Sequence, residues 1–282
     1  MHFTDQPSDT EPLLYVRQLK PAPKQSVALS QSGTEQHPKF SIRNDYPGPV
    51  EVEITLNDGD NVKTEPGLPQ RFVVDPGQSD TLFVAGGIDE NKSWRLSLKY
   101  HYVIGRPIID YHPTVSYLPP IAPNAIFEIS QAFGGNFSHT DVQNYYAVDI
   151  AMPIGTPIYA ARSGIVLEAD DDYFKGGDNK AYSSEANSIR IFHEDGAMSL
   201  YAHLELEKAQ VYPGLAVTTG QLIGYSGNTG YTTGPHLHFA VQINRGLELA
   251  SVPFTFIDQL GQAKVPLVNT KLVGVVTNNL NH

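Results

Sequence analysis

The sequence predicts a mainly β protein, and three observations support that prediction. Gly and Pro are abundant, at 24 and 21 of 282 residues, and they are spread along the chain. Many short apolar runs end at Asn, Asp, Gly or Pro, as strands joined by turns do. Long amphipathic helices are hard to find. With 40% hydrophobic residues, the chain is long enough for an N-terminal β-sandwich and a C-terminal β-rich domain.

The N-terminal region, residues 1–117, contains short strand-like segments in succession. The turn at Asn57-Asp58-Gly59 tolerates positive φ, and Asp75-Pro76-Gly77 presets a bend, so we expect mostly antiparallel pairing. This pattern is typical of an Ig-like sandwich. The expected strands are LLYVRQL, SVALS, KFSIRN, VEVEITL, RFVVD, TLFVAG and WRLSLKYHYVI.

A proline-rich linker is predicted at residues 118–124. Pro119, Pro120 and Pro123 cannot donate ladder hydrogen bonds, and they stiffen the chain into an extended connector. The second domain then runs over residues 125–282. Its expected strands lie in AVDIAM, PIYAARSGIVLEAD, NSIRIFHEDG, MSLYAHL, LIGYSG and PHLHFAVQI.

Charge and composition exclude several classes of function. The formal net charge is -11 and no dense block of Lys or Arg is present, so neither nucleic acid nor an anionic membrane surface is an expected partner. No apolar stretch approaches the roughly 20 residues that a membrane span needs. The segment MHFTDQPSD lacks the apolar core of a signal peptide. Because the chain has no Cys, any metal must be held by His and carboxylates.

Three short motifs carry the candidate chemistry. In GPHLHF, His236 and His238 are two residues apart in a predicted strand, so both imidazoles point to one face. In LYAHL the same alternation places Tyr201 and His203 on one face. In the third motif, YYAVDIAMPIGTP, Asp149 precedes a predicted turn at Gly155-Thr156-Pro157.

Each motif also has an ordinary structural interpretation. An isolated HxH is more often two partly exposed residues, and an Asp before a turn is more often a turn or cap residue. Together, however, the three motifs make a His/Asp cluster possible. Catalytic zinc typically takes three protein ligands and leaves a fourth position for water.

The segments AVDIAMPIGTPIYAARSGIV, SLYAHL and SGNTGYTTGPHLHF, in that order, resemble the lysostaphin-type zinc metallopeptidases that cut peptide cross-links in bacterial cell walls. The resemblance covers roughly residues 125–245. It implies that Asp149 and His238 are metal ligands, and that His203 and His236 are catalytic.

The sequence departs from the commonest pattern of that family at one ligand. There a His stands four residues before the Asp, but position 145 here is Tyr. A phenol must lose a proton with an ordinary pKa near 10 before it ligates well. The nearest upstream histidine is His139, and some members of that family carry a similar Ser-His pair upstream of a Tyr-Ala-x-Asp segment. The resemblance therefore implies that His139, Asp149 and His238 hold one zinc ion per chain.

The remaining candidates receive structural interpretations. We expect a hydrogen bond to the nearby turn at His193, and a loop-stabilising role, rather than substrate orientation, at Asn187. The run Asp170 to Asp172 is expected to be a solvated loop rather than a calcium or glycosidase site. The long stretch 170–187 is expected to wall a substrate groove. Five histidines lie outside the motifs and are not expected to touch zinc: His2, His37, His101, His112 and His282.

The resemblance implies a zinc endopeptidase that hydrolyses peptide bonds in peptidoglycan stems or cross-bridges. Such an enzyme works in the periplasm or is secreted to the cell envelope, and its partner is the wall. The alternative is a non-catalytic relative that binds wall peptide or activates another hydrolase, although such relatives usually lack ligands or catalytic histidines. We interpret the N-terminal domain as a positioning or regulatory module, which binds wall or a partner or else occludes the groove.

Overall fold

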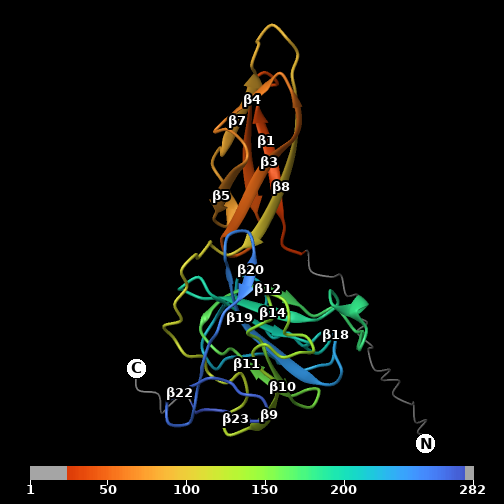
Figure 1. Cartoon of the computed structure of the whole chain (residues 1–282), viewed down its shortest axis with the longest axis vertical. Coiled ribbons are helices and arrows are strands. Elements are labelled where there is room, and N and C mark those ends of the chain that lie inside the picture. Colours follow the sequence, from red (N-terminus) through yellow and green to blue (C-terminus); the bar gives the residue numbers. More distant parts are fainter. Residues whose placement is uncertain (1–23, 277–282) are drawn as a thin grey trace, which may run out of the picture.

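The computed structural model describes residues 24–276, and it confirms the prediction of a mainly β protein. Within these residues the only helix is a single 3₁₀ turn, η1 at Lys180–Tyr182. No helix of the described part is long and apolar enough to cross a membrane. The molecule is elongated, with the N-terminal strands extending away from a broader C-terminal part (Figure 1). The expected strand LLYVRQL lies outside the described residues.

The N-terminal strands form two antiparallel sheets. Their bounds are β1 Val27–Gly33, β2 Pro38–Asn44, β3 Val50–Asp60, β4 Val62–Glu65, β5 Gln70–Val74, β6 Gly77–Gln78, β7 Phe83–Gly87 and β8 Arg95–Ile104. One sheet has the order β1-β2-β7-β4, with β6 paired to β2, and the other has the order β5-β3-β8. The expected strands that lie within the described residues match observed ones, but the short strands β4 and β6 are not among those expected. The sequence of β4, VKTE, has no fully buried residue, and β6 has only two residues, so both give weak signals.

Buried side chains from both sheets join in one apolar cluster. Ile42, Val52 and Phe83 are almost fully buried there, and the ring of Phe40 stacks on that of Phe83 with centroids 4.6 Å apart. Strand β2 alternates buried and exposed positions, as the period of two in a half-buried strand requires. The two sheets share a core in this way, while their assignment to the sandwich class stays a prediction.

The C-terminal part is built on a nine-stranded sheet. Its strands are β9 Ile126–Gln131, β10 Val148–Ala151, β12 Gly164–Asp170, β14 Ser188–Phe192, β15 Met198–Ala202, β16 Ala216–Val217, β19 His236–Asn244, β20 Leu249–Ser251 and β23 Lys271–Val273. The order is β16-β12-β14-β15-β19-β10-β9-β23, with β20 also on β19. Strand β19 lies in the middle of the sheet and is buried along almost its whole length. Its side chains are therefore held in fixed positions.

Three pairs of short strands complete the C-terminal part. The pairs are β11 Pro157–Tyr159 with β17 Leu222–Tyr225, β13 Gly176–Gly177 with β18 Gly230–Tyr231, and β21 Phe256–Ile257 with β22 Ala263–Lys264. The pairing of β13 with β18 is parallel. It attaches the loop between β12 and β14 to the segment that leads into β19.

The segment expected to be an extended linker is packed rather than free. Tyr117, Leu118 and Ile121 are at most 4% exposed, and Tyr117 and Ile121 belong to the apolar cluster of the C-terminal part. The prolines stop ladder pairing, as expected, but the apolar residues between them are buried. The division into domains at residues 118–124 stays a prediction.

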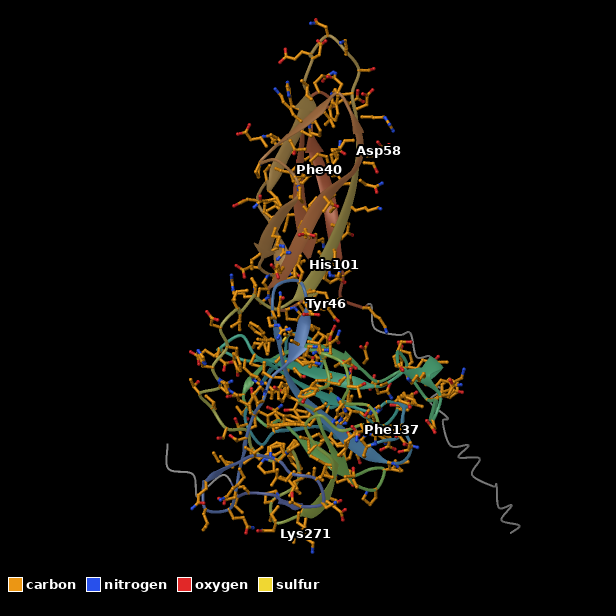
Figure 2. All side chains as sticks on the ribbon, in the orientation of Figure 1. Phe40, Tyr46, Asp58, His101, Phe137 and Lys271 are labelled. Carbon is orange, nitrogen blue, oxygen red and sulfur yellow. The ribbon has the colours of Figure 1, made fainter. Side chains whose placement is uncertain are left out.

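The two parts of the molecule also share buried contacts. Leu167 of β12 and Met198 of β15 belong to the apolar cluster of the N-terminal sheets. Tyr46 lies in the same cluster, at the level where the two parts meet (Figure 2). The N-terminal sheets are thus packed on the C-terminal sheet and not only tethered to it.

Candidate metal centre

The central strands of the C-terminal sheet align the motif residues. Asp149 on β10 lies opposite His238 on β19, and Ala151 lies opposite His236. On the other side of β19, Ala202 lies opposite His238. Because paired residues share a face, Asp149, His236 and His238 face the same space while Leu237 points into the core. The predicted alternation of HLH therefore agrees with the structure.

His139 reaches this space from a loop, residues 132–147, that joins β9 to β10. The loop is closed at its base by a hydrogen bond from Gly134 N to Tyr145 O of 2.7 Å. Gly134 has φ +66°, a conformation that favours glycine. The imidazole of His139 is fully buried, and its Nδ1 donates to Ala132 O at 2.9 Å. The loop thus brings His139, which lies ten positions before Asp149 in the sequence, back to the sheet.

His139, Asp149 and His238 form one buried cluster, here called the His-Asp-His cluster. A ligand atom from each lies within 4.8 Å of the others. Asp149 Oδ1 is 3.2 Å from His139 Nε2 and 2.9 Å from His238 Nδ1. Two imidazoles and a carboxylate are a donor set that zinc accepts, so these residues fit a metal.

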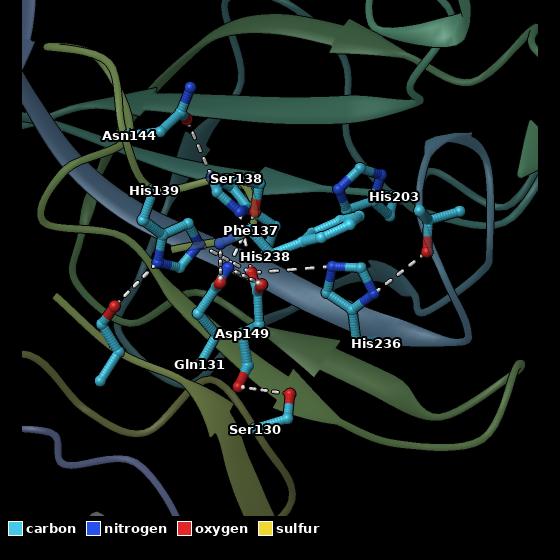
Figure 3. A network of polar contacts seen from close by, with 12 residues as sticks. Ser130, Gln131, Phe137, Ser138, His139, Asn144, Asp149, His203, His236 and His238 are labelled. Carbon is cyan, nitrogen blue, oxygen red and sulfur yellow. Dashed lines mark hydrogen bonds and ion pairs between the residues drawn. The ribbon is translucent and has the colours of Figure 1, made fainter. Parts of the chain in front are cut away.

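Outer partners fix the orientation of both imidazoles in this cluster. His139 Nδ1 is held by the Ala132 carbonyl, and His238 Nε2 donates to Asn144 Oδ1 at 3.1 Å. Each ring therefore turns its other nitrogen toward Asp149 (Figure 3). Hydrogen bonds of this kind set the tautomer of histidines that ligate metals.

Tyr145, at the position that the commonest pattern gives to a His, is 48% exposed. Its ring packs on Tyr146 with centroids 4.9 Å apart, and its hydroxyl lies near Gly134. Burial thus distinguishes Tyr145 from the fully buried His139.

His203 and His236 lie beside the His-Asp-His cluster. Their rings are 4.6 Å apart between centroids, and His236 Nε2 is 3.6 Å from Asp149 Oδ1. Nδ1 of His203 donates to Thr229 O at 2.6 Å, and Nδ1 of His236 donates to Gly234 O at 2.8 Å. With Nδ1 engaged, Nε2 of each ring is the nitrogen that remains for proton transfer.

The expectation that Tyr201 and His203 share a face is wrong. Strand β15 ends at Ala202, and His203 has φ +63°, so the alternation stops there. Tyr201 is fully buried in the core, and its hydroxyl accepts a hydrogen bond from Ala161 N at 2.7 Å. The left-handed backbone at His203 turns its side chain toward His236 and His238.

The electrostatics of the cluster favour a charged carboxylate and neutral flanking imidazoles. Burial opposes the charge of Asp149, but the hydrogen bonds from His139 and His238 hold its pKa well below the usual range. Burial also opposes charge on His139, yet its contact with Asp149 raises its pKa. Burial lowers the pKa of His203 to about 3, aided by His236 and His238, and burial lowers the pKa of His236.

Two residues have structural roles, as expected, although the side chain of His193 does not bond the turn that follows it. His193 is 1% exposed; its Nδ1 donates to Ser163 O at 2.9 Å, and its Nε2 contacts Ser199 Oγ at 3.0 Å. Asn187 is fully buried, and its amide bonds Tyr173 N, Tyr173 O and Leu204 O. Asn187 therefore fastens the loop between β12 and β14.

Sequence reasoning did not single out Gln131 and Asn144, which contact Asp149 and His238. Neither lies in one of the three motifs. The available signal for Gln131 is its place at the end of FEIS, a short run that alternates apolar and polar residues as a strand does. For Asn144 no pattern distinguished it from an ordinary loop residue.

The sheet, the buried cluster of two imidazoles and one carboxylate, and the two flanking imidazoles together define a candidate metal-dependent hydrolase. The family model of peptidase family M23 matches residues 143–248. The match includes Asp149, His203, His236 and His238, and it begins after His139.

Similar proteins agree with this match. A glycyl-glycine endopeptidase, ALE-1 of Staphylococcus capitis, is 34% identical over 136 residues, 48% of this chain and 35% of that protein. The peptidoglycan DD-endopeptidase ShyA of Vibrio cholerae is 40% identical over 98 residues, 35% of this chain and 20% of that protein. The solved catalytic domain of the antimicrobial peptidase lysostaphin from Staphylococcus simulans is 33% identical. It aligns with 43% of this chain and 81% of that chain, at a TM-score of 0.31.

The chain spans about a third or less of the length of the curated relatives it matches. Over residues 143–248 the C-terminal part is thus similar to the lysostaphin-type peptidases of family M23. The resemblance found in the sequence is confirmed.

Proposed function

We propose that this protein is a zinc-dependent endopeptidase that hydrolyses peptide bonds in the stems or cross-bridges of bacterial peptidoglycan. The observation that carries the proposal is the buried His-Asp-His cluster with two histidines beside it. The printed names of two relatives, a glycyl-glycine endopeptidase and a peptidoglycan DD-endopeptidase, support the substrate class. A wall substrate in turn favours a periplasmic or secreted location.

In this proposal His139, Asp149 and His238 hold one zinc ion per chain. When bound, zinc supplies a Lewis acid that polarises the scissile carbonyl and activates water. Asp149 stays ionised in the folded protein, so it is ready to bind a cation without first losing a proton. The outer hydrogen bonds of His139 and His238 aim one nitrogen of each ring into the cluster.

His203 and His236 are assigned the proton transfers. Both are neutral near pH 7, because burial lowers the pKa of each, so each can accept a proton through Nε2. A protonated imidazole then stabilises the oxyanion of the tetrahedral intermediate through a hydrogen bond. Their backbone carbonyl partners keep the two rings oriented throughout.

Two elements are suited to flank the substrate. The loop between β12 and β14 is attached to β18 just before His236. Phe137, two residues before His139, stacks on Tyr231 of β18 with centroids 5.2 Å apart, and 47% of it is exposed. We infer that the peptide lies along the surface formed by this aromatic pair and the loop.

Metal analysis combined with digestion of purified walls tests the proposal. We expect one zinc per chain and release of soluble peptide from the wall. A chelator should abolish this release, zinc should restore it, and magnesium should not, because a site with two imidazole ligands disfavours magnesium. Undiminished release by verified metal-free protein would refute the zinc mechanism. Bound zinc without release from any wall type would favour the wall-binding alternative.

A further inference from the structure

Gln131 is the last residue of β9 and lies beside the His-Asp-His cluster. The register places it opposite Asp149 on the neighbouring strand β10. It directly precedes the loop that carries His139. Gln131 therefore lies where the strand that carries Asp149 meets the loop that carries His139 (Figure 3).

The side chain of Gln131 uses both ends of its amide in this position. Nε2 donates to Asp149 Oδ2 at 2.8 Å and to Ser138 Oγ at 2.8 Å. Oε1 accepts a hydrogen bond from Phe137 N at 3.2 Å. Both amide protons and the amide oxygen are thus engaged, which is nearly the full hydrogen-bonding capacity of a glutamine.

The two oxygens of the Asp149 carboxylate have different partners. Oδ2 is held by Gln131, whereas Oδ1 faces His139 Nε2, His238 Nδ1 and His236 Nε2 at 3.2, 2.9 and 3.6 Å. A carboxylate with no partner on Oδ2 could rotate and present either oxygen, or both. With that donor in place, only Oδ1 points into the cluster.

We propose that Gln131 is a positioning residue that fixes the Asp149 carboxylate so that it offers Oδ1 alone to the metal. This inference rests on the proposed metal centre and adds a residue that acts through Asp149. The bonds to Ser138 and Phe137 hold the neighbouring His139 loop to the same amide. Partners of this kind typically change metal affinity by about 10- to 100-fold when they are removed.

The test compares zinc affinity in wild-type protein and Gln131→Met by competition with a coloured chelator. Met keeps the length of the side chain but has no donor, so we expect zinc to bind about 10- to 100-fold more weakly. Ser138→Ala removes only the bond of this amide to the His139 loop and leaves its bond to Asp149, so it should lose clearly less zinc affinity than Gln131→Met. Gln242→Met removes another buried glutamine of the same sheet, which bonds Gln143 O at 2.8 Å, and it controls for lost stability.

A cobalt-substituted protein gives a second reading that does not depend on activity. Four-coordinate cobalt absorbs visible light more strongly than five- or six-coordinate cobalt, so a carboxylate that binds through both oxygens should weaken the band. We expect this weakening in Gln131→Met and also in Gln131→Glu. The glutamate variant keeps an acceptor for Phe137 N and so protects the fold.

The outcomes separate this inference from the proposed function. Wild-type protein that binds no zinc would overturn both. The role of Gln131 alone would be overturned if wild-type protein binds zinc and the Gln131 variants do not differ from it. This means that both variants have the wild-type cobalt spectrum and that Gln131→Met has the wild-type zinc affinity. Equal losses of zinc affinity in Gln131→Met and Gln242→Met would also overturn it, because the effect would then be one of general stability.

Discussion

At the scale of single residues, the proposed metal centre depends on which nitrogen each histidine turns inward. His139 offers Nε2 and His238 offers Nδ1, because the Ala132 carbonyl and Asn144 occupy the opposite nitrogens. His203 and His236 both engage Nδ1 with backbone carbonyls. Only His238 thus turns Nδ1 inward, and the other three imidazoles keep Nε2 free. The proposed ligands are distinguished by their distance to Asp149 Oδ1, which is 3.2 Å for His139 and 2.9 Å for His238 but 3.6 Å for His236.

The first prediction concerns the ligand at the unusual position. His139→Ala should weaken zinc binding severely, because it leaves only Asp149 and His238 in the cluster. Tyr145→Phe should leave zinc affinity nearly unchanged, since a neutral imidazole ligates without a proton penalty and a phenol does not. Zinc stoichiometry and affinity measured on both variants check this. Loss of metal from the Tyr145 variant, with retention by the His139 variant, would show a phenolate ligand instead.

The second prediction concerns the two flanking histidines. His203→Ala and His236→Ala should each keep zinc but lose turnover by about 10² to 10⁴-fold, the usual contribution of a positioned proton carrier. Initial rates of peptide release, measured beside zinc content, check this. Metal loss from either variant would mean that the ligands and the proton carriers are wrongly assigned.

The third prediction concerns His193, which lies outside the His-Asp-His cluster and has its pKa lowered to about 4 by burial. Above pH 6.5 the imidazole is neutral in both the folded and the unfolded chain. As pH falls below that value the unfolded chain takes up a proton first, so the folded state loses stability until about pH 4. A shift of this size corresponds to roughly 3 kcal/mol of unfolding free energy.

Chemical denaturation of chelated wild-type protein and His193→Gln, at pH 7 and at pH 4, measures this effect. The wild type should lose roughly 3 kcal/mol more than the variant over this range, since titration of every other group is common to both. Equal losses would mean that His193 is protonated inside the folded protein.

At the scale of strands and loops, period-two alternation explains what the sequence could predict. It correctly placed His236 and His238 on one face, because β19 is regular and runs through both residues. It failed at His203, because β15 ends one residue earlier and the backbone adopts positive φ there. Strand periodicity carries no information about a residue beyond the end of its strand.

Loop geometry explains what the sequence could not predict. The closeness of His139 to Asp149 depends on the Gly134 N to Tyr145 O bond and on the Gln131 amide. Both contacts join residues that no short motif links. The choice of His139 over Tyr145 was therefore reached by the chemistry of the donor group, and the structure adds the burial of His139 to that argument.

At the scale of the whole molecule, buried contacts join the N-terminal sheets to the C-terminal part. Glu51 of β3 is 4% exposed, and its Oε2 accepts hydrogen bonds from Asn244 Nδ2 at 3.0 Å and from Leu247 N at 2.7 Å. The approach is close elsewhere too, since a Cβ added at Gly48 would lie 2.7 Å from Leu167 Cδ2. We therefore expect the two parts to unfold together.

The last prediction tests this coupling with Glu51→Ala. The substitution leaves Leu247 N without its acceptor and Asn244 with one acceptor fewer, which should cost about 1 to 3 kcal/mol. Glu53→Ala on the same strand is the matched control, because its ion pair with Arg71 is partly exposed and contributes little.

Two probes follow denaturation in this experiment. Trp94, the single tryptophan of the chain, reports on the N-terminal sheets, and circular dichroism reports on all strands. In the wild type both probes should give one coincident transition, since Glu51 and the shared apolar cluster span the junction. In Glu51→Ala the midpoint should fall, and in Glu53→Ala it should not. Separate transitions in the wild type would show that the N-terminal sheets fold as an independent unit. Equal effects of the two variants would show that the Glu51 contacts do not couple the two parts.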